Sequence, residues 1–197
     1  MPQMRRRELL HRSASALLAM PLASAGRSAL ADAGNDTGLV LTRLAVQRAE
    51  EGLLLSYDVR FDLPDDIESA LSKGVAVTFV ARAELLRVRW YWLDQTRARA
   101  VRRWRLAYQP LTRQWRVSFD GLSRQYTQLS DALDVLRRTN RWRIAEPTAY
   151  ASDQDHEVVF RFMLDPNELP RPLQIGLGGQ TDWNVAVERR VPVPSAP

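Results

Sequence analysis

The sequence contains no cysteine, and its 197 residues include only two histidines and one lysine, Lys73. The absence of cysteine excludes disulfide bonds, thiol nucleophiles and thiolate metal sites. His11 lies in an N-terminal segment that we expect to be removed, so His156 is the only histidine left for a metal site or a catalytic triad. The composition therefore excludes a multi-histidine metal centre in the mature chain.

The first 31 residues have the pattern of a secretory signal peptide. A basic cluster, Arg5–Arg7, precedes a mildly apolar run from Ala14 to Ala25, and Ala29-Leu30-Ala31 matches a small-residue cleavage site. The run is short and is interrupted by proline and glycine, which argues against a transmembrane span. The alternative is a cytosolic amphipathic helix. We predict a cleaved signal peptide over residues 1–31 and a periplasmic mature protein.

This leader bears on the export route and on the charge of the mature protein. The stretch "RRRELL" resembles a twin-arginine export signal, and the Sec route stays open. Removal of residues 1–31 takes away five arginines and one glutamate, so the net charge falls from +5 to +1. Proteins that bind nucleic acid usually keep a large positive field on the folded domain. We therefore predict no nucleic-acid partner.

Apolar and polar residues alternate along most of the remaining chain. In "LLLSYDVRFD", residues 53–62, every second residue is apolar, which predicts a strand with one buried face. Leu39–Gln47 can pair with this strand as a hairpin. The stretch "LPDDIESALSKG", residues 63–74, predicts a short helix.

A longer strand is expected from Val75 to Trp92. The apolar residues change from odd to even positions at Leu85-Leu86, which predicts a β-bulge there. With this bulge, Leu86, Trp90 and Trp92 lie on the buried face, while Tyr91 shares the outer face with Arg87 and Arg89.

The stretch "RRWRLAYQPLTRQWRV", residues 102–117, has five arginines and two tryptophans. Base stacking requires exposed aromatic rings beside the cations, whereas alternation places the two on opposite faces of a strand. The pattern favours a hairpin with Trp104 and Trp115 inward and Arg103, Arg105 and Arg116 outward.

The rest of the chain completes a β-rich fold. "QLSDALDVLRRTN", residues 128–140, predicts a second short helix with Ser130 as N-cap and with Leu133 and Leu136 facing the core. Further strands are expected in "RWRIA", "HEVVFRFMLD" and "DWNVAVERRV", the last burying Trp183, Val185 and Val187. About nine strands and two minor helices predict a mainly β protein, a single antiparallel β-sandwich of immunoglobulin-like general architecture over residues 38–191. Residues 192–197 are expected to form a flexible tail.

Two short stretches resemble ligand sites without completing one. Asp153, Asp155 and Glu157 alternate as in a calcium loop, but Val158 stands where that loop needs glycine. "GLGGQ", residues 176–180, lacks the lysine and hydroxyl residue of a phosphate loop. A solvated loop and a turn are favoured, so we predict no catalytic residue, no cofactor and no metal.

The candidate interaction surface is a basic outer sheet face. It comprises Arg87, Arg89, Tyr91, Arg103, Arg105 and Arg116. Such a face can meet an anionic partner, including lipid headgroups in a peripheral membrane contact. The alternative is an ordinary solvated sheet face.

Residues 90–142 resemble an uncharacterised proteobacterial family, domain of unknown function 4390. The resemblance rests on Trp92-Leu93-Asp94, "RLAYQPLTRQWRV", "YTQL" and "DALDVL", and further on "FMLDPNELPRPLQ" towards the C-terminus. It implies an exported protein without an assigned activity, often encoded beside a nitrogen-type sensor kinase. The family supplies no catalytic residues to transfer.

These observations favour a non-enzymatic interaction module of the cell envelope, with an envelope protein as partner. The alternative is a periplasmic hydrolase or carbohydrate-binding protein that uses carboxylates such as Asp94 or Asp120. Two carboxylates converging in a concave pocket would favour that alternative.

Overall fold

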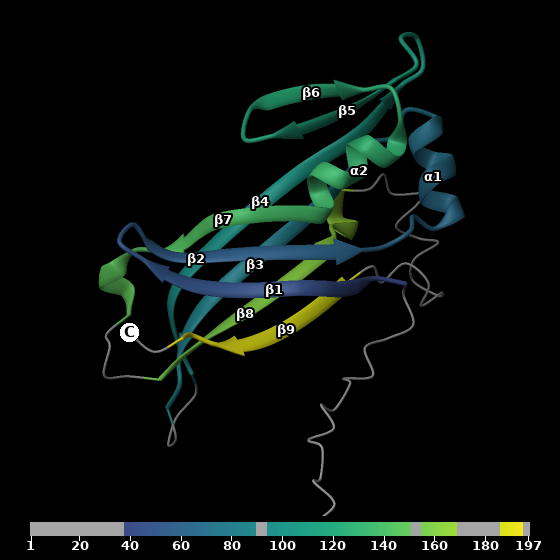
Figure 1. Cartoon of the computed structure of the whole chain (residues 1–197). Coiled ribbons are helices and arrows are strands. Elements are labelled where there is room, and N and C mark those ends of the chain that lie inside the picture. The colour runs from purple at the N-terminus through teal and green to yellow at the C-terminus, as the bar shows by residue number, and fades with distance from the viewer. Residues whose placement is uncertain (1–37, 90–93, 151–154, 169–185, 195–197) are drawn as a thin grey trace, which may run out of the picture. The chain divides into compact units, whose positions relative to one another are not determined.

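The computed structural model describes residues 38–89, 94–150, 155–168 and 186–194 (Figure 1). The predicted signal peptide and the glycine-rich stretch 176–180 lie outside these ranges. So do Trp90, Tyr91, Trp92, Asp153, Trp183 and Val185, on which some of the predictions above depend.

Nine strands of the described residues form two antiparallel sheets. The three-stranded sheet has the order β1-β2-β7, with β1 Val40–Ala49, β2 Gly52–Arg60 and β7 Arg138–Ala145. The six-stranded sheet has the order β6-β5-β4-β3-β8-β9. Its strands are β3 Val77–Arg87, β4 Gln95–Gln109, β5 Gln114–Phe119, β6 Leu122–Tyr126, β8 His156–Leu164 and β9 Ala186–Pro192.

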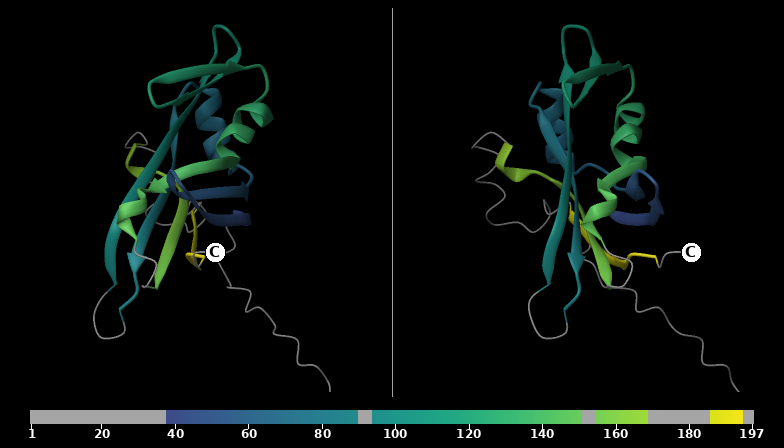
Figure 2. Two further views of the ribbon diagram at one scale, coloured as in Figure 1. Left: turned by 60° about the vertical axis from the view of Figure 1, so that its left-hand side comes forward. Right: turned by 90° about the vertical axis from the view of Figure 1, so that its left-hand side faces the viewer.

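The two sheets pack face to face, and two short helices, α1 Asp65–Ser72 and α2 Leu129–Arg137, complete the fold (Figure 2). Helix α2 lies on the same side of the six-stranded sheet as the three-stranded sheet and contacts β2, β5, β6 and β7. Two 3₁₀ turns, η1 Pro147–Ala149 and η2 Pro166–Glu168, follow β7 and β8. None of the helices described is long and apolar enough to cross a membrane. The prediction of a mainly β, two-sheet protein with two short helices is confirmed.

A cluster of aromatic rings fills the space between the sheets. Tyr57 and Phe61 come from the end of the three-stranded sheet, and Phe79, Phe160 and Phe162 come from β3 and β8. Their ring centroids lie 4.7 to 6.1 Å apart. All five side chains are completely buried, because the alternation of β2, β3 and β8 turns one face of each strand inward.

The predicted bulge is present, but its extra residue is on the opposite strand. The β3–β4 register shifts between Leu85 and Leu86, where Arg97 of β4 has no partner. Pairing of β3 with β8 continues without a shift through Leu86 and Arg87. Leu86 therefore lies on the outer face of the sheet, and the prediction that it lies on the inner face was wrong. It is nevertheless buried.

Other local predictions needed smaller corrections. Helix α2 begins at Leu129 after Gln128, so Ser130 lies inside the helix and is not its N-cap. Leu133 and Leu136 are buried as predicted. Strand β4 begins seven residues before Arg102, and β6 was not predicted. Of the predicted tail, residues 192–194 are described, and Pro194 accepts a hydrogen bond from Arg48 Nε at 2.6 Å.

Candidate functional site

The β4–β5 hairpin separates tryptophans from arginines largely as predicted. Trp104 is 3% exposed and belongs to the core, whereas Arg103 and Arg105 on either side of it are exposed. Trp115 is only half-buried, although it packs against the core. It lies on β5, which is next to the edge strand β6 of the sheet.

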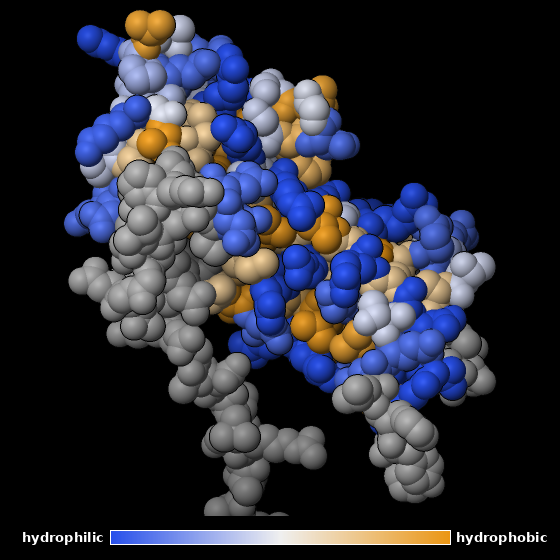
Figure 3. Space-filling view, turned by 180° about the vertical axis from the view of Figure 1, so that it is seen from behind, coloured by the Kyte–Doolittle hydropathy of each residue, from blue (hydrophilic) through white to orange (hydrophobic). Residues whose placement is uncertain are grey.

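Three of the predicted surface residues lie together on the outer face of the six-stranded sheet. Arg105 pairs with Ser118, and Ala107 with Arg116, in the β4–β5 register. Residues opposite one another, and residues two apart on one strand, share a face. Arg103, Arg105 and Arg116 therefore form a basic strip on one face, as predicted. Figure 3 shows the side of the molecule to which this face belongs, where hydrophilic side chains alternate with small apolar patches.

The other three members of the predicted surface do not join the basic strip. Arg87 lies opposite His156, and the uninterrupted β3–β8 pairing gives it the inner-face orientation of Leu85. The prediction that Arg87 shares the outer face was wrong, because β3 does not carry the extra residue of the bulge. Arg89 follows the end of β3 and donates a hydrogen bond to Gln95 Oε1 at 2.5 Å. Tyr91 lies outside the described residues.

The basic strip differs from much of the other half of the same sheet face in its ion pairing, although Arg82 of β3 in that half also has no ion-pair partner among the described residues. Towards β9, Arg99 pairs with Glu84 at 2.8 Å, Arg161 with Glu188, and Arg190 with Asp94 and Glu157 at 2.9 and 3.1 Å. Within the described part of the chain, Arg103, Arg105 and Arg116 have no ion-pair partner. The buried Nε of Arg116 also lacks a hydrogen-bond partner there.

The ion-paired half contains the carboxylates of a small pocket of about 210 Å³. Glu84 and Glu188 both line it, together with the apolar residues Leu86 and Val159. Each carboxylate is already held by an arginine, and so is Asp94, which the hydrolase alternative required. Arg190 donates hydrogen bonds to Asp94 and Glu157, and these bonds stabilise its charged form and raise its pKa. This arrangement is that of structural ion pairs.

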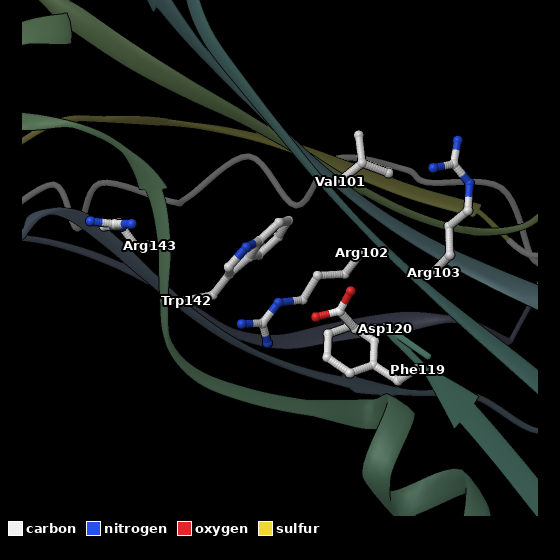
Figure 4. Close-up of a pocket in the computed structure, with 7 residues that line it drawn as sticks. All are labelled: Val101, Arg102, Arg103, Phe119, Asp120, Trp142 and Arg143. Atoms are coloured by element: carbon white, nitrogen blue, oxygen red, sulfur yellow. The ribbon is translucent and has the colours of Figure 1, made fainter. Parts of the chain in front are cut away.

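A larger pocket of about 530 Å³ lies where β7 approaches β4 and the end of β5 (Figure 4). Its lining residues are Val101, Arg102, Arg103, Phe119, Asp120, Trp142 and Arg143. The guanidinium of Arg102 lies between the rings of Trp142 and Phe119, 5.1 and 5.4 Å from their centroids. The side chain of Arg103 turns away from the pocket, and Asp120 lies beside Arg102.

Two backbone irregularities place the residues around Arg102. Asp120 and Gly121, both with positive φ, form the two-residue turn between Phe119 and Leu122, which is the geometry of a type I′ hairpin. In β7 the register with β2 shifts between Leu55 and Tyr57, and Arg141 there has a φ of 49°. Its amide donates to Ser56 Oγ at 3.0 Å. Such a bulge re-aims the following side chain, here that of Trp142.

Burial shifts the pKa of two residues near this pocket, Arg102 and Tyr57. Desolvation lowers the pKa of the half-buried Arg102, and the charge of Asp120 acts in the opposite direction. Arg102 stays charged, because guanidinium is not deprotonated in proteins. Desolvation also raises the pKa of Tyr57, whose hydroxyl donates to the Leu136 carbonyl at 3.4 Å.

Sequence reasoning did not single out Arg102 as a site residue. It occupies the same alternation as Trp104 and Leu106, so its position on the inward face was visible in the sequence. An arginine among inward-facing apolar residues is the feature that could have identified it. Trp142 could not have been found this way, because only the fold brings β7 next to β4.

Asp94 and Asp120, the two carboxylates of the alternative hydrolase, occupy different surroundings. Asp94 is bound to Arg190 of β9, whereas Asp120 lines the larger pocket beside Arg102. His156 is buried at the start of β8. Among the residues that the structure describes, no group of three or more potential ligands is placed to hold a metal ion.

Comparison with known proteins identifies a family. The family model "Domain of unknown function (DUF4390)" matches residues 36–191. No curated protein and no solved structure matches the chain. The matched residues comprise all nine described strands and both helices, apart from the last residue of β9, and the chain therefore belongs to the family of domain of unknown function 4390.

Proposed function

We propose that the protein is an exported, non-enzymatic interaction module of the cell envelope. In this proposal the outer face of the six-stranded sheet contacts an anionic surface of an envelope protein through the basic strip. The single observation that carries the proposal is the contrast in ion pairing along this face. Arg103, Arg105 and Arg116 have no acidic partner in the described part, while Arg99, Arg161 and Arg190 on the same face do.

Physical arguments support a binding role for the strip. Unpaired guanidinium groups on a sheet offer a fork of donors that matches carboxylates of a partner. The exposed Arg103 and Arg105 are placed to steer an anionic partner towards the face. The half-buried Arg116 has already lost part of its hydration, so pairing it with an anion costs less further desolvation than pairing a fully solvated group.

The ion pairs that the pocket carboxylates form with arginines favour a binding function over hydrolysis. Glycosidase-type hydrolysis uses one carboxyl group as acid and a second as base or nucleophile. Glu84 and Glu188 in the smaller pocket are both neutralised by arginines, and Asp120 is the one carboxylate among the lining residues of the larger pocket. A non-enzymatic module is the function that these surroundings favour.

Site-specific photo-crosslinking in cells tests the proposal. Gln125 is exposed and lies opposite Arg116, so a photo-crosslinking amino acid at Gln125 samples the basic strip. The same amino acid at the exposed Arg60 samples the three-stranded sheet as a control. We expect one protein adduct from position 125 and not from position 60, with the co-encoded sensor kinase as first candidate.

Matched double variants test whether the arginine charges of the basic strip are needed for binding of the partner. Arg103→Gln/Arg105→Gln removes two charges from the strip, and Arg60→Gln/Arg189→Gln removes two exposed charges elsewhere. We expect the adduct at position 125 to weaken strongly in the first and to persist in the second. An equal adduct from both positions, or an adduct unaffected by the strip variant, would refute the proposal. Adducts with lipid alone would instead assign the face to membrane contact.

A further inference from the structure

We propose that the pocket around Arg102 is a binding site for a small organic carboxylate, whose carboxylate group is held by the Arg102 guanidinium. This inference does not rest on the proposed function, because Arg102 faces inward, whereas the basic strip lies on the outer face of the same sheet. Only Arg103 borders both.

The first argument is the state of the Arg102 guanidinium. It is half-buried, and within the described residues it makes neither a hydrogen bond nor an ion pair. Partial removal of a charged group from water, without hydrogen-bond partners in the protein, has a free-energy cost that a bound anion would offset. Residues that violate the usual burial rules in this way occur chiefly at functional sites.

The second argument is the orientation that the two rings impose. Trp142 and Phe119 lie against Arg102 on two sides, and both contacts are of the cation–π type. A guanidinium whose faces are covered keeps its N–H donors at its edges, where two parallel hydrogen bonds to a carboxylate can form. The rings thus hold the fork in one orientation before a ligand arrives, which lowers the entropic cost of binding.

The third argument is the composition of the pocket wall. Phe119 and Trp142 supply apolar surface, and a volume of about 530 Å³ is within the usual range of small-molecule sites. Arg143 is paired with Glu146 at 3.3 Å, so its charge is partly compensated. The wall therefore suits a molecule with one apolar part and one anionic group.

The negative charge of Asp120 determines which class of anion the pocket is expected to bind more tightly. It lies beside Arg102 and interacts with its charge. A monoanionic carboxylate is repelled less by Asp120 than a phosphate that carries a charge near −2. The expected order of affinity is therefore an aromatic carboxylate before inorganic phosphate.

NMR titration of the isotope-labelled protein tests the inference, with sodium benzoate and inorganic phosphate as probes at constant ionic strength. We expect saturable shifts of the Trp142 indole N–H and the Arg102 Nε–H with benzoate, and binding of phosphate that is several-fold weaker. Shifts that grow linearly with concentration, or that spread over all arginines, would overturn the inference. Phosphate binding at equal or higher affinity would overturn the assignment to carboxylates.

Variants at two arginines of β4 test the role of Arg102 and supply the control. Arg102→Lys keeps the charge and loses the fork, and we expect it to weaken benzoate binding at least about tenfold, the lower end for a lost charge-assisted hydrogen bond. Arg102→Met removes the charge while preserving apolar contact with both rings. Arg105 is exposed on the outer face of the sheet and is not among the lining residues of the pocket, so Arg105→Gln is expected to bind benzoate as the wild type does. Unchanged binding in both Arg102 variants, with folding verified by circular dichroism, would refute the proposal.

Discussion

Trp104 of β4 stacks on Phe119 of β5, with ring centroids 5.4 Å apart and an angle of 21° between the ring planes. The two residues are directly paired in the β4–β5 register, and Trp104 is 3% exposed. This contact makes the tryptophan of the arginine-rich hairpin a structural residue.

Replacement of Trp104 should therefore affect folding much more than replacement of its exposed neighbour. We expect Trp104→Ala to lower the free energy of unfolding by about 3–5 kcal/mol, and Arg105→Ala to change it by no more than about 0.5 kcal/mol. Trp115→Ala should cost less than Trp104→Ala, because Trp115 is less completely buried. Urea unfolding measures all three. If Trp104→Ala unfolded like the wild type while both changes abolished DNA binding at low salt, the hairpin would be a nucleic-acid surface.

Gly52 should tolerate no side chain. It has a φ of +128°, and a Cβ atom built there would lie 2.2 Å from the Ala145 carbonyl oxygen. Gly121 also has a positive φ, +75°, but its Cβ would meet nothing within 4 Å. We expect Gly121→Ala to cost about 1–2 kcal/mol of backbone strain and Gly52→Ala clearly more, because it adds a backbone clash. Thermal unfolding compares the two, and equal costs would contradict the close approach of β2 to β7.

Tyr57 should contribute to alkaline unfolding. Burial raises the pKa of its hydroxyl above the ordinary value of 10.0. The unfolded chain therefore loses this proton first, so folding stability is unaffected below about pH 10 and falls as the pH rises above it. We expect Tyr57→Phe to remove this part of the pH dependence. It should also cost about 0.5–1.5 kcal/mol near neutral pH through the lost hydrogen bond.

Urea unfolding at a series of alkaline pH values separates these effects. Tyr108→Phe is the control, because Tyr108 is only half-buried at the end of β4. An identical decline of stability above pH 10 in wild type and Tyr57→Phe would contradict the burial of this hydroxyl.

The N-terminal segment should be absent from the exported protein. The pattern Ala29-Leu30-Ala31 predicts cleavage before Asp32. Intact-mass measurement of protein from the periplasmic fraction should give a chain that begins at Asp32. Recovery of the full-length chain from the cytosol would contradict both the cleavage and the periplasmic location.

Much of the fold could be predicted because burial alternates along single strands. Residues 53–61 place each second side chain in the core, as their sequence pattern indicates. The N-terminal boundary of α2 was harder to predict from the sequence, because neither Gln128 nor Ser130 makes a capping hydrogen bond to the helix. Strand β6 is short and almost entirely exposed, so it lacks the apolar alternation that reveals a strand.

The sequence by itself determined which residues alternate, and with them the two-sheet architecture and the basic strip of Arg103, Arg105 and Arg116. It could not decide which strand of a pair carries the bulge at Leu85-Leu86, because an extra residue in either strand shifts the register equally. Only the tertiary structure brought Trp142 of β7 against Arg102 of β4, forty residues earlier. The alternation of apolar and polar residues can be read within a single strand. A pocket depends on contacts between strands that are far apart in the sequence, and no local sequence pattern shows which strands will meet.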